Sequence, residues 1–257
     1  INQYDLKTNK FHPLKITGIT QKPSYRQALH LLERLVQVMM PDSTGNIWFG
    51  TYVGLLKYDL HKNTFSYYEN DETNPASLSQ NTVNSICELN GSMFFGTALG
   101  GISVMDTGKE TFTNYRNDPF NPSSLSDNSI TVLYKDRENR IWAGTKGGGI
   151  NMLEPPCTDF VLYTNEMLKV NTNLNTSIHS IFAICKGRDS DLYIGSDNGF
   201  SILNTVTGNS KLLQTAYIRN GIKVPCPVFS IVRSRTGEYW LGGIGFCLHA
   251  IRSIWWV

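Results

Sequence analysis

The sequence predicts an all-β fold, and three observations support that prediction. A stretch made of a turn, a short aromatic strand and a glycine break, residues 42–55, returns four more times along the 257-residue chain. The glycine after the aromatic strand recurs at intervals of 46, 48, 51 and 47 residues, at positions 50, 96, 144, 195 and 242. Only strand signals lie within each interval, which is typical of a repeat architecture built from sheets.

The bulk composition narrows the class of protein. Apolar residues make up 40% of the chain and charged residues 17%, which is typical of a globular rather than a disordered chain. The net charge is +2 without a basic stripe, so nothing favours nucleic acid or an anionic membrane surface as a partner. No apolar run approaches the ~18 residues of a membrane span. The first residues show neither Met nor a signal-peptide pattern, so we expect a piece of a longer protein.

Each repeat divides into four short strands, named A to D in chain order. In the second repeat the expected strands are residues 83–88, 93–97, 101–106 and 111–115. They are rich in β-branched or aromatic residues and bounded by turn formers. We expect antiparallel hairpins, because about one strand falls in every dozen residues with no helical period between them.

The turns between strands have physical explanations. From A to B, residues 42–45 predict a type I turn whose glycine takes positive φ, and Gly91, Asn139 and Gly237 fit the same slot. Ser190 does not fit, so we expect the fourth of these turns to be altered. From B to C, paired glycines are expected to let the backbone reverse without Cβ clashes: Gly50 and Gly54, Gly96 and Gly100, Gly144 and Gly148.

The connection from strand D to the next strand A is the longest. Residues 74–81 and 121–128 match at six of eight positions, 47 residues apart. Proline restricts the preceding asparagine to extended geometry, and the Ser and Asn side chains can cap backbone groups. The single leucine is expected to plug the space between adjacent sheets. The first linker, residues 24–35, departs from this pattern, and its composition favours a short helix.

Sheets of this kind predict a β-propeller. A four-stranded sheet of short twisted strands has two partly apolar faces that it cannot bury alone, and radial packing of such blades covers both. A parallel β-helix is disfavoured because its coils are shorter than this pitch. The aromatic of strand B is expected to fill the gap between neighbouring blades and to bury about 150–250 Å2. These aromatics are Trp48, Phe94, Trp142, Tyr193 and Trp240.

We expect a single propeller domain or fragment over residues 1–257. Its expected parts are a part-blade at 1–18, blades at about 36–68, 83–115, 130–163 and 178–213, a part-blade at 228–248 and a non-matching tail at 249–257. Strands A and B of the last part-blade are followed by residues 245–248. A closed five-bladed ring and an arc of a seven-bladed ring of about 330 residues both remain compatible with the sequence.

The cysteines argue against a disulfide framework. Their number is odd and their positions are scattered, and no Cys-x-x-Cys pair suggests zinc: Cys87, Cys157, Cys185, Cys226 and Cys247. Cys87 and Cys185 stand at the end of strand A, where Met40 and Tyr134 stand in two other repeats. We therefore expect a buried apolar position that accepts cysteine.

With these residues laid out, the chain resembles the two-component regulator propeller repeats. Their pattern is roughly D-x-x-G-x-[IL]-W-x-G-T-x-x-G-[GL]-[IL], followed by a Y-D/T-x-x-F hairpin and an S-L-x-x-N linker. Repeats one and three match closely, with Asn139 in place of Gly. Repeat two has Phe94 for Trp, and repeat four has Tyr193 and Ser196 for Trp and Thr. Repeat five stops matching after Gly243, so the resemblance covers nearly all of residues 4–246.

This resemblance implies the periplasmic sensor part of a hybrid two-component histidine kinase of gut bacteria. It implies an oligosaccharide ligand, further propeller and β-sandwich domains of the same parent chain, a homodimer, and kinase activity elsewhere in the parent. Neither nucleic acid nor direct membrane contact is expected for this segment. The alternatives are a propeller enzyme, either a lyase or a hydrolase, and a non-catalytic protein-interaction scaffold. The recurring residues are structural, so the ligand-binding positions stay unknown. The best candidate surface is the face shared by the D–A and B–C loops.

No catalytic, cofactor-binding or metal-binding residue is expected. Residues 106–108 imitate the Asp-Thr-Gly triplet of aspartic proteases, but a hairpin turn needs the same residue types. Residues 189–191 lack the glycine and glutamate of a calcium loop, and residues 147–149 lack the helix and lysine of a phosphate loop. His179, near a strand A, is a weak enzymatic candidate among histidines that do not cluster in sequence: His12, His30, His61, His179 and His249.

Overall fold

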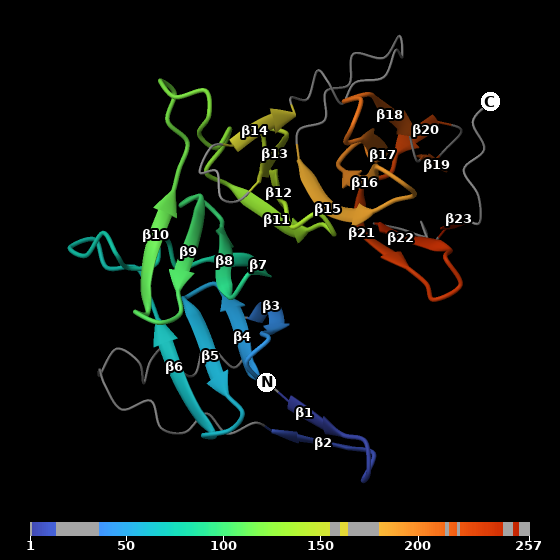
Figure 1. The fold of residues 1–257 in the computed structure, drawn as a ribbon. Helices are drawn as coiled ribbons and strands as arrows, with labels where there is room; N and C mark the ends of the chain where they lie inside the picture. Colours follow the sequence, from blue (N-terminus) through green and yellow to red (C-terminus); the bar gives the residue numbers. More distant parts are fainter. Residues whose placement is uncertain are drawn as a thin grey trace. The chain divides into compact units, whose positions relative to one another are not determined.

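The computed structural model is built from strands arranged in antiparallel sheets (Figure 1). It describes residues 2–13, 36–154, 160–163, 180–213, 216–219, 222–243 and 249–251, and these residues contain no helix. The expected all-β class is confirmed, since four of the sheets have four antiparallel strands each. The helix expected at residues 24–35 lies outside the described residues. The chain divides into two compact units, Ile1–Tyr115 and Arg116–Val257, which are described in turn.

The first unit contains a hairpin and two four-stranded sheets. The hairpin pairs β1 (Asn2–Asp5) with β2 (Lys10–Pro13). Blade 1 consists of β3 (Val36–Pro41), β4 (Asn46–Thr51), β5 (Leu55–Asp59) and β6 (Thr64–Tyr68). Blade 2 consists of β7 (Val83–Leu89), β8 (Ser92–Thr97), β9 (Ile102–Asp106) and β10 (Thr111–Tyr115). The strands of blade 2 lie where the sequence predicts them, within one residue at each end.

The second unit contains two four-stranded sheets, a hairpin and a three-stranded sheet. Blade 3 consists of β11 (Ile130–Lys135), β12 (Ile141–Thr145), β13 (Ile150–Leu153) and β14 (Phe160–Tyr163). Blade 4 consists of β15 (Ile181–Lys186), β16 (Asp191–Ser196), β17 (Gly199–Asn204) and β18 (Ser210–Leu213). The hairpin is β19 (Ala216–Arg219) with β20 (Ile222–Pro225). Blade 5 consists of β21 (Val228–Arg233), β22 (Tyr239–Gly243) and β23 (His249–Ile251).

Blade 5 departs from the prediction at its third strand. Residues from 249 onward were expected to match no repeat position, yet β23 pairs antiparallel with β22, with Trp240 opposite Ala250. In the other blades a hydroxyl residue follows the strand B glycine. Here Gly242 is followed by Gly243, so that hydroxyl is missing and the third strand starts later.

Three of the five strand B aromatics fill the space between neighbouring blades, as predicted: Trp48, Trp142 and Tyr193. In the first unit, Trp48 of blade 1 is fully buried in a cluster with Val83 and Phe95 of blade 2, and the linker residue Leu78 plugs the same cluster. The Trp48 and Phe95 ring centroids lie 5.3 Å apart. The leucine plug and the interblade wedge are therefore both confirmed here.

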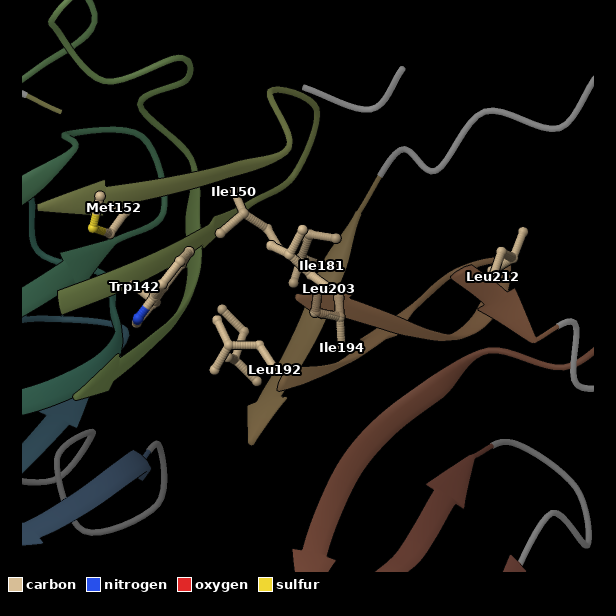
Figure 2. Close-up of a cluster of buried hydrophobic side chains, with 9 residues drawn as sticks. Trp142, Ile150, Met152, Ile181, Leu192, Ile194, Leu203 and Leu212 are labelled. Atoms are coloured by element: carbon tan, nitrogen blue, oxygen red, sulfur yellow. The ribbon is translucent and has the colours of Figure 1, made fainter. Parts of the chain in front are cut away.

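The second unit repeats this packing. Figure 2 shows Trp142 and Met152 of blade 3 in one cluster with Ile181, Leu192 and Ile194 of blade 4. Trp142 has no exposed surface. Burial of such a ring removes about 150–250 Å2 from water, so each pair of blades depends on it for much of its joint stability.

Blades 4 and 5 use smaller rings at the same place. Tyr193 of blade 4 packs against Val228 and Tyr239 of blade 5, and the two tyrosine ring centroids lie 4.6 Å apart. Trp240 of blade 5 occupies the equivalent position but is 45% exposed, so its expected burial is wrong for this blade. Among the described residues of this unit, Trp142 and Tyr193 each pack in a hydrophobic cluster with residues of the next blade. Trp240 belongs to neither cluster.

The strand B glycine has a different role from the expected one. A Cβ at Gly50 would lie 2.8 Å from Cγ1 of Val83, and a Cβ at Gly144 would lie 2.7 Å from Cγ2 of Ile181. Val83 and Ile181 begin strand A of the following blade, so the glycine lets the next sheet approach closely. Reversal of the chain falls instead to later glycines such as Gly149, whose φ is 84°. The expectation that Gly50 and Gly144 serve the reversal is wrong.

Asp42 in the first A–B turn satisfies the buried indole. Its Oδ2 accepts hydrogen bonds from Nε1 of Trp48 and Nδ2 of Asn46, both at 2.8 Å, and its Oδ1 accepts from the backbone of Thr44 and Asn46. Burial alone would raise the pKa of Asp42, but these bonds favour the charged form and lower it to about 2. The indole N–H thereby avoids the cost of an unmade hydrogen bond.

The two fully buried strand B tryptophans, Trp48 and Trp142, each have an aspartate partner. In blade 3, Oδ2 of Asp136 accepts from Nε1 of Trp142 and from Nε of Arg140, both at 2.7 Å. Burial would raise the pKa of Asp136, but these hydrogen bonds outweigh it and lower the pKa. In blade 4, where Tyr193 replaces the tryptophan, Gly187 replaces the aspartate. A Cβ at Gly187 would lie 2.5 Å from Cε1 of Tyr193, so the ring itself takes the space.

The three cysteines within the described ranges fall into two groups. Cys87 and Cys185 are thiols opposite the strand B aromatics Phe94 and Tyr193, Cys87 buried and Cys185 half-buried, in line with the expected apolar position. Burial raises the pKa of Cys185. Cys226 is buried and disulfide-bonded, which corrects the expectation drawn from the scattered cysteines. Sequence separation does not report distance in a fold whose connections cross between sheets.

We predict that Gly144→Ala lowers the free energy of unfolding by about 1–3 kcal/mol, because the added methyl overpacks the contact between blades 3 and 4. Urea unfolding monitored by tryptophan fluorescence measures the effect. Gly147→Ala is the control: a Cβ there meets only the end of the Asp127 side chain, at 3.2 Å. Equal destabilisation by the two variants would contradict the close-approach role of Gly144.

We predict that Asp42→Asn lowers the free energy of unfolding by about 1 kcal/mol at neutral pH, allowing for solvent screening. The folded-state pKa is depressed, so the carboxylate stabilises the fold above its unfolded pKa of about 4, and this stabilisation is lost as the pH falls towards about 2. Urea titrations over this range should show the wild type and the variant converging. Glu72→Gln, an exposed carboxylate in the same unit, should show no such convergence.

Candidate functional site

The B–C turns are held by a buried hydroxyl at the end of strand B. Thr51 Oγ1 donates to the carbonyl of Gly54 at 2.7 Å, and its backbone N–H bonds the same carbonyl. The same side-chain bond recurs at 2.9 Å for Thr97 and for Thr145, and at 3.1 Å for Ser196. Ser196, which replaces the threonine of the repeat pattern, therefore makes the same hydrogen bond across the turn. These turns present their tip residues from a rigid base.

The D–A linker of blade 2 is fixed to the blade that it precedes. The backbone N–H of Ser79 donates to Oγ of Ser103 in β9 at 3.0 Å, and Oγ of Ser103 donates to Oδ1 of Asn114 in β10 at 2.7 Å. Nδ2 of Asn114 donates to the carbonyl of Ser77 at 2.9 Å. The backbone N–H of Asn70 donates to Oδ1 of Asn81 at 2.7 Å, which joins the two ends of the linker. The linker is thus an ordered surface of the blade.

The linker of blade 3 repeats this arrangement with different partners. The backbone N–H of Ser126 donates to Oδ1 of Asn151 in β13 at 3.0 Å, and Nδ2 of Asn151 donates back to Oγ of Ser126 at 2.8 Å. A Cβ at Gly148 would lie 2.4 Å from Oγ of Ser126, so this glycine admits the linker. Blade 1 has the buried Leu56 at the Asn151 position. Its linker, residues 24–35, also lacks the Ser-Leu motif.

One hydroxyl residue before strand A joins neighbouring turns in the first unit. Oγ1 of Thr82 donates to the carbonyl of Tyr52 in blade 1 at 3.2 Å. The carbonyl of Thr82 accepts the N–H of Ala98 in blade 2 at 3.0 Å. Thr82 therefore sets the B–C turns of blades 1 and 2 side by side, on the same face as the linker.

Ser180 has the same role in the second unit. Its Oγ donates to the carbonyl of Lys146 in blade 3 at 2.9 Å, and its carbonyl accepts the N–H of Asp197 in blade 4 at 3.2 Å. Both units therefore carry a rim of aligned B–C turns. We call the residues at the tips of these turns the rim residues.

The rim residues do not repeat, unlike the residues that hold them. Tyr52 is 50% exposed and Leu99 is 72% exposed in the first unit. In the second unit Lys146 is exposed, Asp197 is half-buried, and Phe120 of the neighbouring linker is 95% exposed. Sequence analysis pointed to this face but named no residue. The tip position after the clamping hydroxyl is the signal that could have identified Tyr52 and Lys146.

Charged groups also join blades 1 and 2 of the first unit to each other. Tyr68 of blade 1 donates its hydroxyl to Oε1 of Glu110 of blade 2 at 2.9 Å, and Nζ of Lys57 lies 3.7 Å from the same oxygen. Nζ of Lys57 also lies 5.4 Å from the centroid of the Trp48 ring. Burial, followed by the charge of Glu110, raises the pKa of Tyr68. These groups belong to the blade contact.

The sequence segments that resemble an aspartic-protease triplet and a calcium loop, residues 106–108 and 189–191, lie in ordinary turns. Oδ1 of Asp106 accepts from the backbone N–H of Gly108 and Lys109 within its own hairpin. Asp189 takes the left-handed conformation of the fourth A–B turn, with φ of 45°, which confirms that this turn is altered at Ser190. Across the described ranges, no three of the His, Cys, Asp and Glu side chains form a group that could hold a metal ion. His179 lies outside those ranges.

A pocket of about 230 Å3 opens on blade 4, near its C–D turn. Its walls are Asp191, Ile202, Asn204, Thr207, Asn209, Ser210 and Lys211. Asn204 is engaged within its own turn: Oδ1 accepts from the backbone N–H of Val206 and Thr207, and Nδ2 donates to Asp191 at 3.0 Å. The polar groups of this pocket therefore mainly hold the turn.

Comparison with known proteins identifies the repeat. Residues 124–147 match the family model described as two component regulator propeller. This segment contains the Ser126 clamp of the linker, the Trp142 wedge and the Thr145 turn. No curated protein matches the chain. No helix in the described ranges is long and apolar enough to cross a membrane.

Solved structures share the fold at low identity. The chain is 21% identical to the extracellular domain of the hybrid two component system BT3049 from B. thetaiotaomicron, with a TM-score of 0.63 over 81% of this chain and 32% of that one. It thus spans about a third of that structure's length.

Two other similar structures come from proteins of other kinds. The β-propeller domain of Cps50 (Swd1) from Myceliophteria thermophila is 11% identical, with a TM-score of 0.56 over 81% of this chain and 62% of that one. Virginiamycin B lyase from Staphylococcus aureus is 16% identical, with a TM-score of 0.55 over 80% and 62%. Likeness at this level concerns the fold alone. The chain therefore carries a two component regulator propeller repeat within a fold of β-propeller type.

Proposed function

We propose that the chain is part of an extracytoplasmic ligand-sensing propeller of a hybrid two-component sensor histidine kinase, and that it detects an oligosaccharide. The observation that supports this most is the family match at residues 124–147, because the matched residues are the ones that hold the blades and the rim together. The similar BT3049 structure is described as an extracellular domain of such a system. The disulfide at Cys226 suits an oxidising, extracytoplasmic compartment.

The rim supports binding rather than catalysis as the role of this segment. Its recurring hydroxyls and glycines are used in turn and blade contacts, whereas the exposed side chains at the turn tips differ from blade to blade, Tyr52 in the first unit and Lys146 in the second. Such groups offer hydrogen bonds and an aromatic face to a sugar. In this proposal, ligand binding shifts the arrangement of propellers in a dimer of the parent protein, and the shift reaches the kinase across the membrane.

Two other functions make different predictions for the same surface. A lyase or hydrolase, suggested by the fold shared with virginiamycin B lyase, would convert its ligand. A protein-interaction scaffold would use the exposed apolar side chains Tyr52 and Leu99 to contact a protein partner and would ignore sugars. A binding measurement that also monitors the chemical fate of the ligand separates these three cases.

We predict that titration calorimetry of the chain against neutral and acidic plant and host oligosaccharides detects at least one ligand that is recovered unchanged by mass spectrometry. Lys146→Ala should weaken its affinity about tenfold, the effect of about 1.4 kcal/mol of lost contact. Lys109→Ala, whose side chain is 79% exposed in a C–D turn, is the matched control and should bind normally. New products would favour the enzyme. Silence towards every sugar would contradict the proposal.

A further inference from the structure

The A–B turns of the second unit carry basic residues at two repeated positions. In blades 3, 4 and 5 the turn is closed by the same hydrogen bond, from the N–H of its first residue to the carbonyl oxygen four residues later. The bonds are 3.1, 2.9 and 2.8 Å long and start at Asp136, Gly187 and Ser234. A basic residue stands on either side of each of these donors: Lys135 and Arg137, Lys186 and Arg188, Arg233 and Arg235. They lie one repeat apart in the sequence, so no basic run reveals them.

The first unit shows that these two positions meet across neighbouring blades. Blade 1 closes its turn in the same way, from Asp42 at 2.9 Å, and Ser43 follows it. In blade 2, Glu88 stands at the end of strand A, opposite the residue that precedes the strand B aromatic, as Lys186 does in blade 4. The N–H of Ser43 donates to Oε2 of Glu88 at 2.9 Å, and its hydroxyl donates to Oε1. A carboxylate is therefore held between these blades.

In the second unit the same two positions hold cations. Arg137 of blade 3 stands in the place of Ser43, and Lys186 of blade 4 stands in the place of Glu88. Arg188 of blade 4 and Arg233 of blade 5 repeat the arrangement. Two neighbouring cations repel each other, and an anion that lies between them is stabilised by both. The chain supplies this anion in the first unit and replaces it with a cation in the second.

The acidic residues of these turns leave an excess of positive charge. The three turns hold seven basic and five acidic side chains, in residues 135–140, 186–191 and 233–238. Asp136 lies 2.7 Å from Nε of Arg140, and Glu138 lies 3.4 Å from Nη2 of Arg140 and 3.7 Å from Nζ of Lys186. Two members of the set have further interactions within the chain: Arg188 and Glu238. Within the described residues, no ion pair reaches the remaining three arginines: Arg137, Arg233 and Arg235.

The basic residues of the three turns gather around Tyr239. The guanidinium carbon of Arg233 lies 5.6 Å from the centroid of its ring, and its hydroxyl donates to the carbonyl of Lys186 at 3.2 Å. Burial raises the pKa of Tyr239, and the charges of Arg233, Arg188 and Arg137 each act on it in the opposite direction. Arginines from three blades thus surround one buried tyrosine, on turns whose backbones are hydrogen-bonded.

We propose that the A–B turns of blades 3 to 5 bind a ligand that carries sulfate or phosphate groups. One such group takes, beside Arg137 and Lys186, the place that the Glu88 carboxylate takes in the first unit. A second group lies beside Arg233. The planar fork of arginine matches two oxygens of a tetrahedral oxyanion, which a single carboxylate from one direction cannot share among several arginines. The A–B and B–C turns lie at opposite ends of strand B, so this site is separate from the rim and goes beyond the proposed function.

The test is titration calorimetry of the chain with two probes at constant ionic strength, because salt screens exposed charges. Sucrose octasulfate supplies sulfate groups and inositol hexakisphosphate supplies phosphate groups, so the preferred probe identifies the oxyanion. We expect at least one to bind, and Arg137→Gln and Arg233→Gln each to weaken the binding about tenfold. Lys109→Gln is the matched control: it removes the same charge from an exposed C–D turn of the first unit and should bind normally.

A charge-reversal variant separates binding from folding. Arg137→Glu puts a carboxylate beside Lys186, as Glu88 does beside Ser43, and should abolish the binding without lowering the thermal midpoint of unfolding. The bound probe should raise that midpoint in the wild type and not in this variant. Full affinity in Arg137→Glu would overturn the proposal.

Three further results would also overturn it. The first is that neither probe binds. The second is that Arg137→Gln binds normally while Arg233→Gln loses both binding and thermal stability, which would assign Arg233 to packing on Tyr239. The third is that hexaglutamate binds as tightly as the two probes, which would assign the surface to an acidic protein segment instead of an oxyanion ligand.

Discussion

The burial of the strand B tryptophan against the next sheet is the interaction on which each unit depends. Trp48 and Trp142 are each covered by the following blade, and each donates its indole N–H to an aspartate six residues earlier in the chain. The ring supplies the apolar area that a single sheet lacks, and the aspartate removes the cost of burying its polar atom. The glycine two residues after the tryptophan then brings the next strand A within contact distance.

This constraint explains why the repeated residues leave little room for function. The aspartate, the tryptophan, the glycines, the turn hydroxyl and the linker serine are all engaged within the blades. Side chains that differ from blade to blade can occur only at positions where the repeat fixes the backbone but does not require a particular residue type. Two such sets occur: the rim residues at the tips of the B–C turns, and the residue at the β-bulge near the start of each strand A. The residue types of both sets vary from blade to blade.

Much of the fold could be predicted from the sequence because its determinants are local and repeated. The strands of blade 2, the wedge role of Trp48 and Trp142, and the leucine plug at Leu78 follow from spacing and residue type. The bond from Trp48 to Asp42 does not, since a turn aspartate has a sufficient local explanation. The close approach of Val83 to Gly50 could not be predicted from the sequence either, because Val83 belongs to another sheet.

The remaining differences have similar causes. The hairpin β19–β20 lies in the connection between blades 4 and 5. This connection lacks the Ser-Leu motif, so no repeat pattern predicted the hairpin. The disulfide of Cys226 depends on proximity in space, which scattered cysteines do not report. For the candidate site, the face could be predicted from topology. The contact between the Phe182 and Phe229 rings, whose centroids lie 4.6 Å apart, could not be predicted, because the two residues belong to different sheets and each lies at a register shift of its strand.

Hydrogen exchange of the indole N–H groups, followed by NMR, tests the central claim most directly. The indole protons of Trp48 and Trp142 should exchange slowly, at rates near those of global unfolding, because exchange requires the blades to part and the aspartate bond to break. The indole of Trp240, which is 45% exposed at the equivalent position, is the internal control and should exchange quickly. Rapid exchange of Trp48 and Trp142 in the folded protein, at the rate of Trp240, would contradict the account.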